Sequence, residues 1–258
     1  MIKVFGPGMR ARIHLPHPER EAARLSSFAL KFIALTCMCI DHMGLALFPS
    51  VSAFRCIGRL AFPLYCFLLS EGYAHTRDIR AYARRLLLLA FISEIPFDLL
   101  IFGRIASGVE QNVVFSLLLG LLALYAADCL SGRRLESVLV LTALCLAAMI
   151  LRVSYGWLGI VLCLGFHFTR EHRFKQALCA ALLCGLYTLS LLFSGVKRSW
   201  ALLSLYATGA SLPILLYNGK RGLHAPVLTF LFYAAYPLHI AMLVLVRALR
   251  IVPPYFLG

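Results

Sequence analysis

The sequence predicts an all-α fold, a polytopic transmembrane bundle of about eight to ten spanning helices. Of its 258 residues, 61% are hydrophobic and 14% are charged, and the mean hydropathy is +0.85. A soluble domain is about half apolar and a quarter charged. Backbone polar groups in lipid must be satisfied internally, which allows helices or closed barrels. The apolar stretches are longer than the roughly ten residues of a barrel strand and do not alternate, so helices are expected.

Nine apolar stretches are expected to form the membrane helices. A helix needs about 20 mostly apolar residues to span a bilayer. The stretches near this length are 28–48, 55–74, 84–103, 112–130, 136–151, 156–169, 176–195, 199–217 and 226–250. The fifth and sixth are short, so we expect them to be tilted, re-entrant or buried within the protein. No segment rich in Gly, Ser or Pro divides the chain, so we expect residues 28–258 to form a single transmembrane domain.

Residues 1–27 form a basic segment ahead of the first apolar stretch. The segment is interrupted by Pro7, Pro16 and Pro18. No short apolar core with a small-residue cleavage site follows it, as a secretory signal would require. We therefore expect a retained cytoplasmic tail.

Positively charged residues predict the orientation of the bundle. With the N-terminus in the cytoplasm, 16 of the 25 Lys and Arg residues fall in cytoplasmic segments and seven in outer segments. Cytoplasmic loops are enriched in these residues, so we expect the N-terminus inside and the C-terminus outside. The same pattern accounts for the net charge of +14 without a nucleic-acid partner. The nine cysteines are scattered and form no CxxC motif, so we expect neither disulfides nor a metal site.

Ionisable residues within the first three stretches are the strongest functional signal. A charge at the bilayer centre costs about 2.5–3.5 kcal/mol even on a lenient scale, so each charged group needs a partner or a polar cavity. These residues are Lys31, Asp41, His42, Arg59, Glu71, His75, Glu94 and Asp98. The later stretches are nearly free of such groups, apart from His167 and His239.

In the predicted orientation, one polar layer lies in the outer half of the membrane. Its members are Asp41, His42, Arg59, Glu94, Asp98 and Asn112. Arg59 is the one cation at this level to meet three carboxylates, Asp41, Glu94 and Asp98, unless His42 is protonated. An ion pair of Arg59 with Glu94 or Asp98 would fix helix packing. Adjacent residues on a helix point about 100° apart, so Asp41 and His42 need separate partners. The layer is either an ion-pair network that fixes helix packing or a catalytic site.

Lys31 and His42 are expected to share one stripe of the first helix. Eleven residues return to within about 20° of the same direction, roughly 16 Å along the axis. Lys31 either snorkels to the interface or holds a phosphate-bearing ligand whose extended arm reaches His42. Four arginines would border the cytoplasmic opening of such a ligand site: Arg77, Arg80, Arg84 and Arg85. The enrichment of Lys and Arg in cytoplasmic loops already explains most of this charge.

These residues lie in stretches that resemble the TraX family, polytopic bacterial membrane proteins linked to acetylation of conjugative pilin. In family order, the stretches are LKFIALTCMCIDHMG (30–44), IGRLAFPLYCFLLSEGYAHTRDIRAYARRL (57–86), SEIPFDLL (93–100), NVVFSLLLGLLA (112–123), SYGWLGIVL (154–162) and FYAAYPLH (232–239). Ser154 stands where the family pattern has an aspartate before Tyr-Gly. The resemblance implies a bacterial inner-membrane location and an acetyl donor, acetyl-CoA, at the cytoplasmic side.

The spacing of Lys31 and His42 is also similar to the Arg-(ten residues)-His signature of membrane O-acyltransferases. In that family the histidine is the proposed catalytic base. Lysine replaces arginine here, and its point charge is less suited to bidentate phosphate binding.

Together these features predict a membrane-embedded acetyltransferase that moves an acetyl group from acetyl-CoA to an amine or hydroxyl of a protein, glycan or lipid. His42 would be the general base. Asp41, Glu94 or Asp98 would orient it or tune its pKa. Arg59 would polarise the thioester carbonyl or hold a carboxylate. The residues expected to bind substrate are Lys31, Glu71, His75, Arg84, Arg85, Asn112, Tyr155 and His239. Two alternatives stay open: a proton-coupled transporter and a non-catalytic membrane assembly factor.

Overall fold

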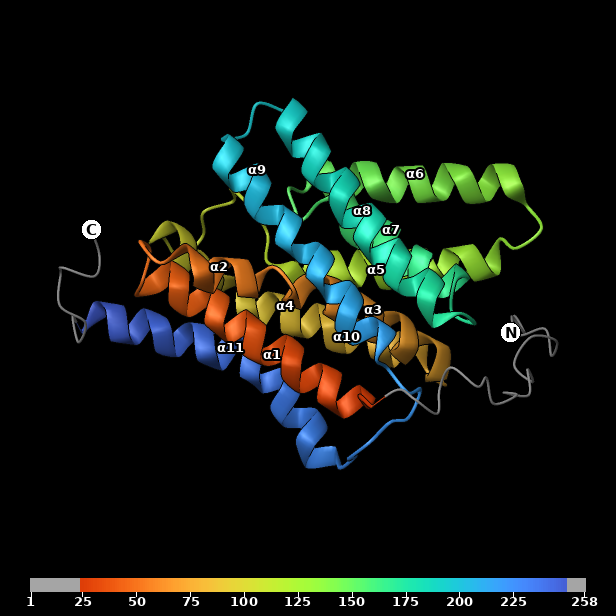
Figure 1. Ribbon diagram of the computed structural model, residues 1–258, viewed down its shortest axis with the longest axis horizontal. Helices are drawn as coiled ribbons and strands as arrows, with labels where there is room; N and C mark the ends of the chain where they lie inside the picture. The colour runs from red at the N-terminus through yellow and green to blue at the C-terminus, as the bar shows by residue number, and fades with distance from the viewer. Residues whose placement is uncertain (1–23, 250–258) are drawn as a thin grey trace.

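The computed structural model describes residues 24–249, which form a bundle of helices with no β-strand among them (Figure 1). The predicted tail over residues 1–27 falls almost entirely outside this range. The helices are α1 (Ser27–Ala46), α2 (Ser52–Gly58), α3 (Ala61–His75), α4 (Ile79–Phe102), α5 (Val113–Cys129), α6 (Arg134–Ile150), α7 (Trp157–Phe168), α8 (Arg173–Phe193), α9 (Arg198–Ser204), η2 (Leu205–Ala210), α10 (Ser211–Leu215) and α11 (Pro226–Ala248).

Each predicted apolar stretch coincides with one helix or with one run of consecutive helices. The second stretch is divided into α2 and α3, and the eighth consists of α9, η2 and α10. Among the described residues, four helices are long and apolar enough to cross a membrane: α1, α2 continued by α3, α8 and α11. The predicted all-α transmembrane bundle is therefore confirmed.

The short sixth stretch, α7, lies at the centre of the bundle. It has only 12 residues and packs against α3, α5 and α8. Leu158 and Leu162 are 1% exposed or less, and the Phe166 ring meets Phe67 edge-on with centroids 5.4 Å apart. This stretch is thus buried within the protein, one of the outcomes that its length predicted.

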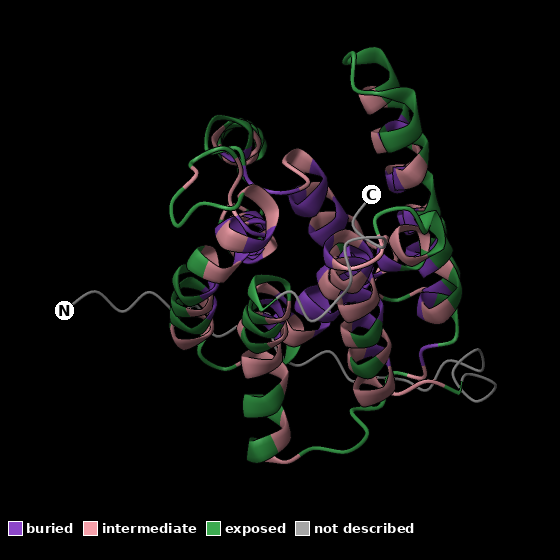
Figure 2. Ribbon diagram, turned by 90° about the vertical axis from the view of Figure 1, so that its left-hand side faces the viewer, coloured by how far each residue is buried: buried purple, intermediate pink, exposed green. Residues whose placement is uncertain are grey.

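Large apolar side chains also cover the outside of the bundle. Leu135 on α6 and Phe193 on α8 are 74% and 89% exposed. In Figure 2 the buried residues face the interior and the exposed ones lie on the outward sides of the helices. Soluble monomers rarely expose contiguous apolar patches of more than a few hundred Å², so this surface is that of a membrane protein.

Local signals fix several helix ends. The side chains of Ser26 and Asp78 accept hydrogen bonds from backbone N–H groups in the first turns of α1 and α4. Asn112 caps α5 in the same way, through Val114 N–H at 3.0 Å. Such caps satisfy N–H groups that have no partner within the helix. Gly103 ends α4 with φ of +68°, a left-handed conformation that glycine adopts readily.

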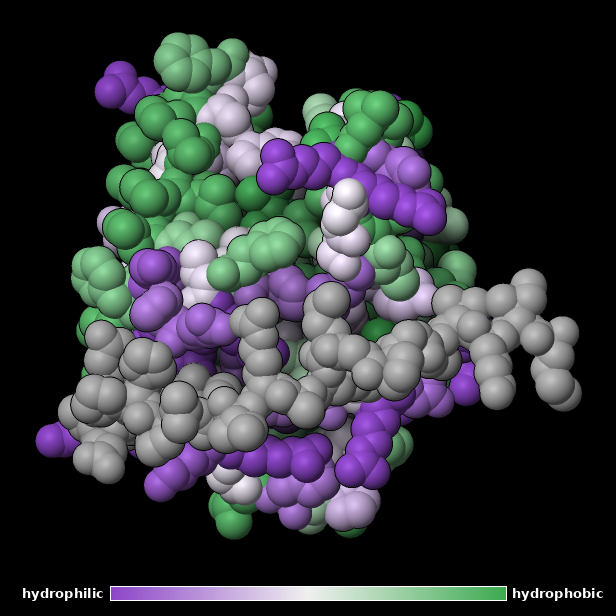
Figure 3. Space-filling view, turned by 90° about the vertical axis from the view of Figure 1, so that its right-hand side faces the viewer, coloured by the Kyte–Doolittle hydropathy of each residue, from purple (hydrophilic) through white to green (hydrophobic). Residues whose placement is uncertain are grey.

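The connections α3–α4, α5–α6, α7–α8 and α10–α11 meet at one end of the bundle, which we call the basic end. Arginines lie in or beside all four connections: Arg77, Arg133, Arg170 and Arg221. Figure 3 views the molecule from the right-hand side of Figure 1 and shows hydrophilic residues over the lower part and at the upper right of this face, with hydrophobic residues over much of its upper half. The four connections that the sequence assigned to the cytoplasm therefore bring their arginines to one end of the bundle.

Two loops pair at the opposite end. Gln111 donates its N–H to Arg152 C=O at 3.0 Å, and Ser154 donates its N–H to Gln111 C=O at 3.0 Å. Arg152 and Tyr155 have φ of +52° and +62°, which is uncommon for residues other than glycine. This pairing holds Asn112 and Tyr155 at the same end of the bundle.

Candidate functional site

His42 and His239 form a hydrogen-bonded pair between α1 and α11, two helices that lie side by side in Figure 1. His42 Nδ1 lies 2.7 Å from His239 Nε2. The two rings are nearly parallel, at 17°, with centroids 5.0 Å apart. His239 Nδ1 lies 2.7 Å from the carbonyl oxygen of Ala235, one turn earlier on α11. Two residues 197 positions apart in the sequence thus form one partly buried unit.

Asp41, the residue before His42, is held by two arginines. Arg55 Nη1 lies 2.7 Å from Asp41 Oδ2, and Arg59 Nη2 lies 2.8 Å from both carboxylate oxygens. The side chains are largely buried, with 14% of each arginine and 12% of Asp41 exposed. Paired and hydrogen-bonded charges of this kind are tolerated at low dielectric.

This arrangement corrects two predictions. Arg59 pairs with Asp41 and not with Glu94 or Asp98, and it is not the only cation in the layer. Arg55, the first residue of the second predicted stretch, was not counted as a member of the polar layer; it belongs to α2, which begins at Ser52. The two arginines are four residues apart, so they face the same side of the helix. The (i, i+4) spacing of Arg55 and Arg59 is the sequence feature from which their shared position could have been predicted.

Glu94 and Asp98 instead bind uncharged partners. Asn112 donates to Glu94 Oε2 from its side chain at 2.5 Å and from its backbone at 3.2 Å. Asp98 accepts from the N–H and hydroxyl of Ser107 at 2.7 and 2.8 Å. Asp98 therefore holds the loop after α4. Within residues 24–249, none of the three carboxylates, Glu94, Asp98 or Asp41, is hydrogen-bonded to His42. The prediction that one of them orients His42 directly is therefore wrong.

Aromatic rings surround the group formed by Asp41, Arg55 and Arg59, which we call the charged layer. The Tyr155 ring stacks on Phe62 with centroids 3.9 Å apart, and the Arg59 guanidinium lies 6.0 Å from the Tyr155 centroid. Arg55 lies over Trp200 at 5.6 Å. The predicted residue Tyr155 is thus brought to the arginine pair, and the guanidinium groups contact ring faces, where a cation is stabilised.

Tyr236 was not predicted and lies beside the histidine pair. Its ring centroid is 6.3 Å from that of His42 and 5.8 Å from that of His239. The hydroxyl is buried, and within residues 24–249 it has no hydrogen-bond partner. An unsatisfied buried hydroxyl costs about 1–3 kcal/mol, so the Tyr236 hydroxyl is a candidate to hydrogen-bond a ligand or a water molecule.

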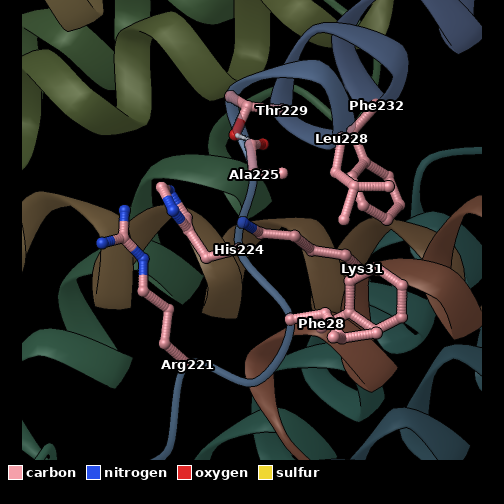
Figure 4. Close-up of a pocket in the computed structure, with 9 residues that line it drawn as sticks. Phe28, Lys31, Arg221, His224, Ala225, Leu228, Thr229 and Phe232 are labelled. Carbon is pink, nitrogen blue, oxygen red and sulfur yellow. Dashed lines mark hydrogen bonds between the residues drawn. The ribbon is translucent and has the colours of Figure 1, made fainter.

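Lys31 lies at the basic end in a narrow pocket between α1 and the start of α11 (Figure 4). Arg221, His224 and Thr229 add polar groups to it, and Phe28 and Phe232 add apolar walls. Lys31 therefore faces α11, as His42 does, and the predicted common stripe is present. Arg221 and His224 were missed, because they come from a loop that periodicity does not describe.

The remaining predicted binding residues lie apart from this pocket. Glu71 is buried and lies 3.6 Å from Arg173, whose guanidinium sits 4.5 Å over the Tyr217 ring. Three others are exposed and do not line the Lys31 pocket: His75, Arg84 and Arg85.

A second polar cluster near the basic end was also missed. Asp128 accepts from the Tyr73 hydroxyl at 2.7 Å and lies 3.1 Å from His167 Nε2. The three residues come from α3, α5 and α7. Residues 24–249 contain no group of three or more His, Cys, Asp or Glu side chains that could hold a metal ion.

Comparisons with known proteins give consistent matches. A family model described as TraX protein matches residues 26–247. The chain is 30% identical over 239 residues to a probable fimbrial assembly protein, FimC of serogroup H1, from Dichelobacter nodosus, with 84% of this chain and 94% of that protein covered. It is 43% identical over 44 residues to an uncharacterized protein of Rickettsia prowazekii (strain Madrid E), covering 17% and 18%. No solved structure matches the chain.

Proposed function

The chain belongs to the TraX family, and we propose that it is a membrane-embedded acetyltransferase that takes its acetyl group from acetyl-CoA. In this proposal the protein sits in a bacterial inner membrane with its basic end in the cytoplasm. The acceptor is an amine or hydroxyl of a protein, glycan or lipid.

One observation carries the proposal: a partly buried imidazole and a basic pocket face the same neighbouring helix, about 16 Å apart along α1. His42 meets His239 of α11 at 2.7 Å, and Lys31 shares a pocket with Leu228 and Phe232 of α11. Eleven residues of helix separate the two side chains, which gives the 16 Å estimate. A donor with phosphates at one end and a reactive acyl group at the other end of a long arm would match this separation, and the water-sized Lys31 pocket would have to widen to admit the phosphates.

The pocket supplies the chemistry that a phosphate needs. Lys31 and Arg221 carry positive charge, His224 adds a further basic group, and no acidic side chain lines the pocket among the described residues. Hydrogen bonds from charged donors to phosphate are about twice as strong as neutral ones. The second cation, Arg221, compensates for the weaker bidentate geometry of the lysine.

His42 acts as the general base. The acceptor nitrogen or oxygen attacks the thioester carbonyl while its proton passes to His42. The carbon–sulfur bond then breaks, and the departing sulfur takes the proton back from His42, so the base is regenerated. Arg55 and Arg59 hold Asp41 beside the base, and the Tyr236 hydroxyl is placed to hydrogen-bond a reacting group.

A non-catalytic assembly factor is the second candidate. The Dichelobacter nodosus relative is named as a probable fimbrial assembly protein. On this alternative, the buried ion pairs would fix helix packing, and the exposed apolar helices would contact a partner.

Purified protein incubated with radiolabelled acetyl-CoA separates the candidates. The enzyme is expected to hydrolyse the donor slowly and to transfer label to a lipid, glycan or peptide in added membrane extract. An assembly factor or a proton-coupled transporter would do neither. His42→Gln provides the matched control, because it keeps a polar side chain and removes the base.

A further inference from the structure

The two ring nitrogens of His239 have different partners, and this difference fixes their protonation. A carbonyl oxygen only accepts hydrogen bonds. Because His239 Nδ1 lies 2.7 Å from Ala235 C=O, that nitrogen must carry a hydrogen. A neutral imidazole has one N–H, so His239 Nε2 then carries a lone pair and accepts.

The same reasoning extends to His42. Its Nδ1 lies 2.7 Å from His239 Nε2, and an accepting nitrogen needs a donor, so His42 Nδ1 carries the hydrogen. Neutral His42 therefore has its lone pair on Nε2, the atom turned away from His239. If His239 were doubly protonated, both of its nitrogens would donate, and His42 would have its hydrogen on Nε2 and no base to offer.

We infer that His239 is a positioning residue that fixes the tautomer of His42 and leaves His42 Nε2 as the atom that receives the acceptor's proton. The inference rests on the proposed transferase only for its consequence in catalysis. In many active sites a third group orients the base, and a carboxylate often has this role. Here the neighbouring carboxylate of Asp41 is held by Arg55 and Arg59, and a neutral imidazole anchored to a backbone carbonyl takes its place.

The proton balance of the pair is complete within the reaction. The acceptor loses one proton, which forms a bond to His42 Nε2, and the His42–His239 pair then carries one positive charge. The Nδ1 hydrogen lies between the two rings, so both imidazoles share that charge. The pair becomes neutral again when the departing sulfur takes the Nε2 proton. Among the described residues, Arg55 and Arg59 lie close enough to His42 to interact with it electrostatically, and Tyr236 lies beside the pair.

Two substitutions at His239 separate tautomer control from packing. His239→Gln keeps a side-chain oxygen that accepts from His42 Nδ1–H, whereas His239→Leu has similar bulk and accepts nothing. We expect His239→Leu to lower kcat by about 10- to 100-fold, short of the loss of the base itself, with the KM for acetyl-CoA unchanged. We expect His239→Gln to recover most of kcat. Leu238→Ala, on the same helix but 65% exposed, serves as the control.

Nitrogen-15 NMR of histidine-labelled protein reads the tautomer without any activity assay. The His42 signals are identified by their loss in His42→Gln. We expect wild-type His42 to carry its hydrogen on Nδ1 and His239→Leu to shift the population toward Nε2–H. An Nε2–H tautomer in the wild type, or wild-type kcat in His239→Leu, would overturn the inference. An Nδ1–H tautomer in a protein that transfers no acetyl group would support the inference and reject the proposed function.

Discussion

Gly58 on α2 packs directly against the carboxylate of Asp41 on α1, so closely that a β-carbon at Gly58 would overlap that side chain. The missing side chain lets α2 approach α1 and brings Arg55 and Arg59 to the same carboxylate. The charged layer therefore depends on a glycine that carries no charge.

Gly58→Ala should push α2 away from Asp41 and lower the free energy of unfolding by about 1–3 kcal/mol, as overpacking does. The comparison is Gly185→Ala on α8, where an added β-carbon meets nothing within 4 Å. That variant should be neutral or slightly more stable, since alanine favours helix. Thermal unfolding in detergent measures both. Equal stability of the two variants would show that the close approach at Asp41 is unimportant.

Asp41→Asn should destabilise the protein more than Arg59→Gln. Loss of the aspartate leaves two arginines facing each other, whereas loss of Arg59 leaves Asp41 paired with Arg55 at 2.7 Å. Removing the shared partner of a buried pair costs about 3–5 kcal/mol. In a double-mutant cycle, Asp41→Asn with Arg59→Gln should recover part of the loss. Additive losses would mean that the two groups do not interact.

Lys31→Ala and Arg221→Ala should raise the KM for acetyl-CoA by roughly 10-fold or more, the effect of losing a charged hydrogen bond, with a smaller change in kcat. Lys220→Ala is the matched control, because Lys220 is exposed and does not line the pocket. Steady-state kinetics in detergent measure these values. A fall in kcat at unchanged KM would mean that the phosphates of acetyl-CoA do not bind in the Lys31 pocket.

The proposed orientation predicts which loops face the cell exterior. In a variant without native cysteines, Ile105→Cys should react with a membrane-impermeant thiol reagent in intact cells, because Ile105 is 66% exposed in the loop after α4. Arg77→Cys, at the basic end, should react only after the cells are permeabilised. The reverse labelling pattern would show that the bundle has the opposite orientation, with the Lys31 pocket outside the cytoplasm.

The elements of the fold and most members of the polar layer were predictable, but Arg55 and the pairing within the layer were not. Hydropathy located all nine stretches, and helical depth brought Asp41, His42, Glu94 and Asn112 to one end of the bundle. Periodicity fixes the face of a residue on its own helix and says nothing about the neighbouring helix. For this reason the sequence assigned Arg59 to Glu94 or Asp98, missed Arg55, and did not pair His42 with His239 on the last helix. The loop partners Ser107 and Arg221 were missed because loops have no regular period.

His42→Ala tests the central claim most directly, since the account makes this imidazole the base in acetyl transfer. The measurement is the rate of label transfer from acetyl-CoA, made alongside thermal unfolding in detergent to establish that the variant is folded. The account predicts a rate about 10²- to 10⁴-fold lower, the usual effect of losing a general base. The variant should insert into the membrane and unfold at the same temperature as the wild type. A folded His42→Ala protein that transfers acetyl groups at close to the wild-type rate would contradict it.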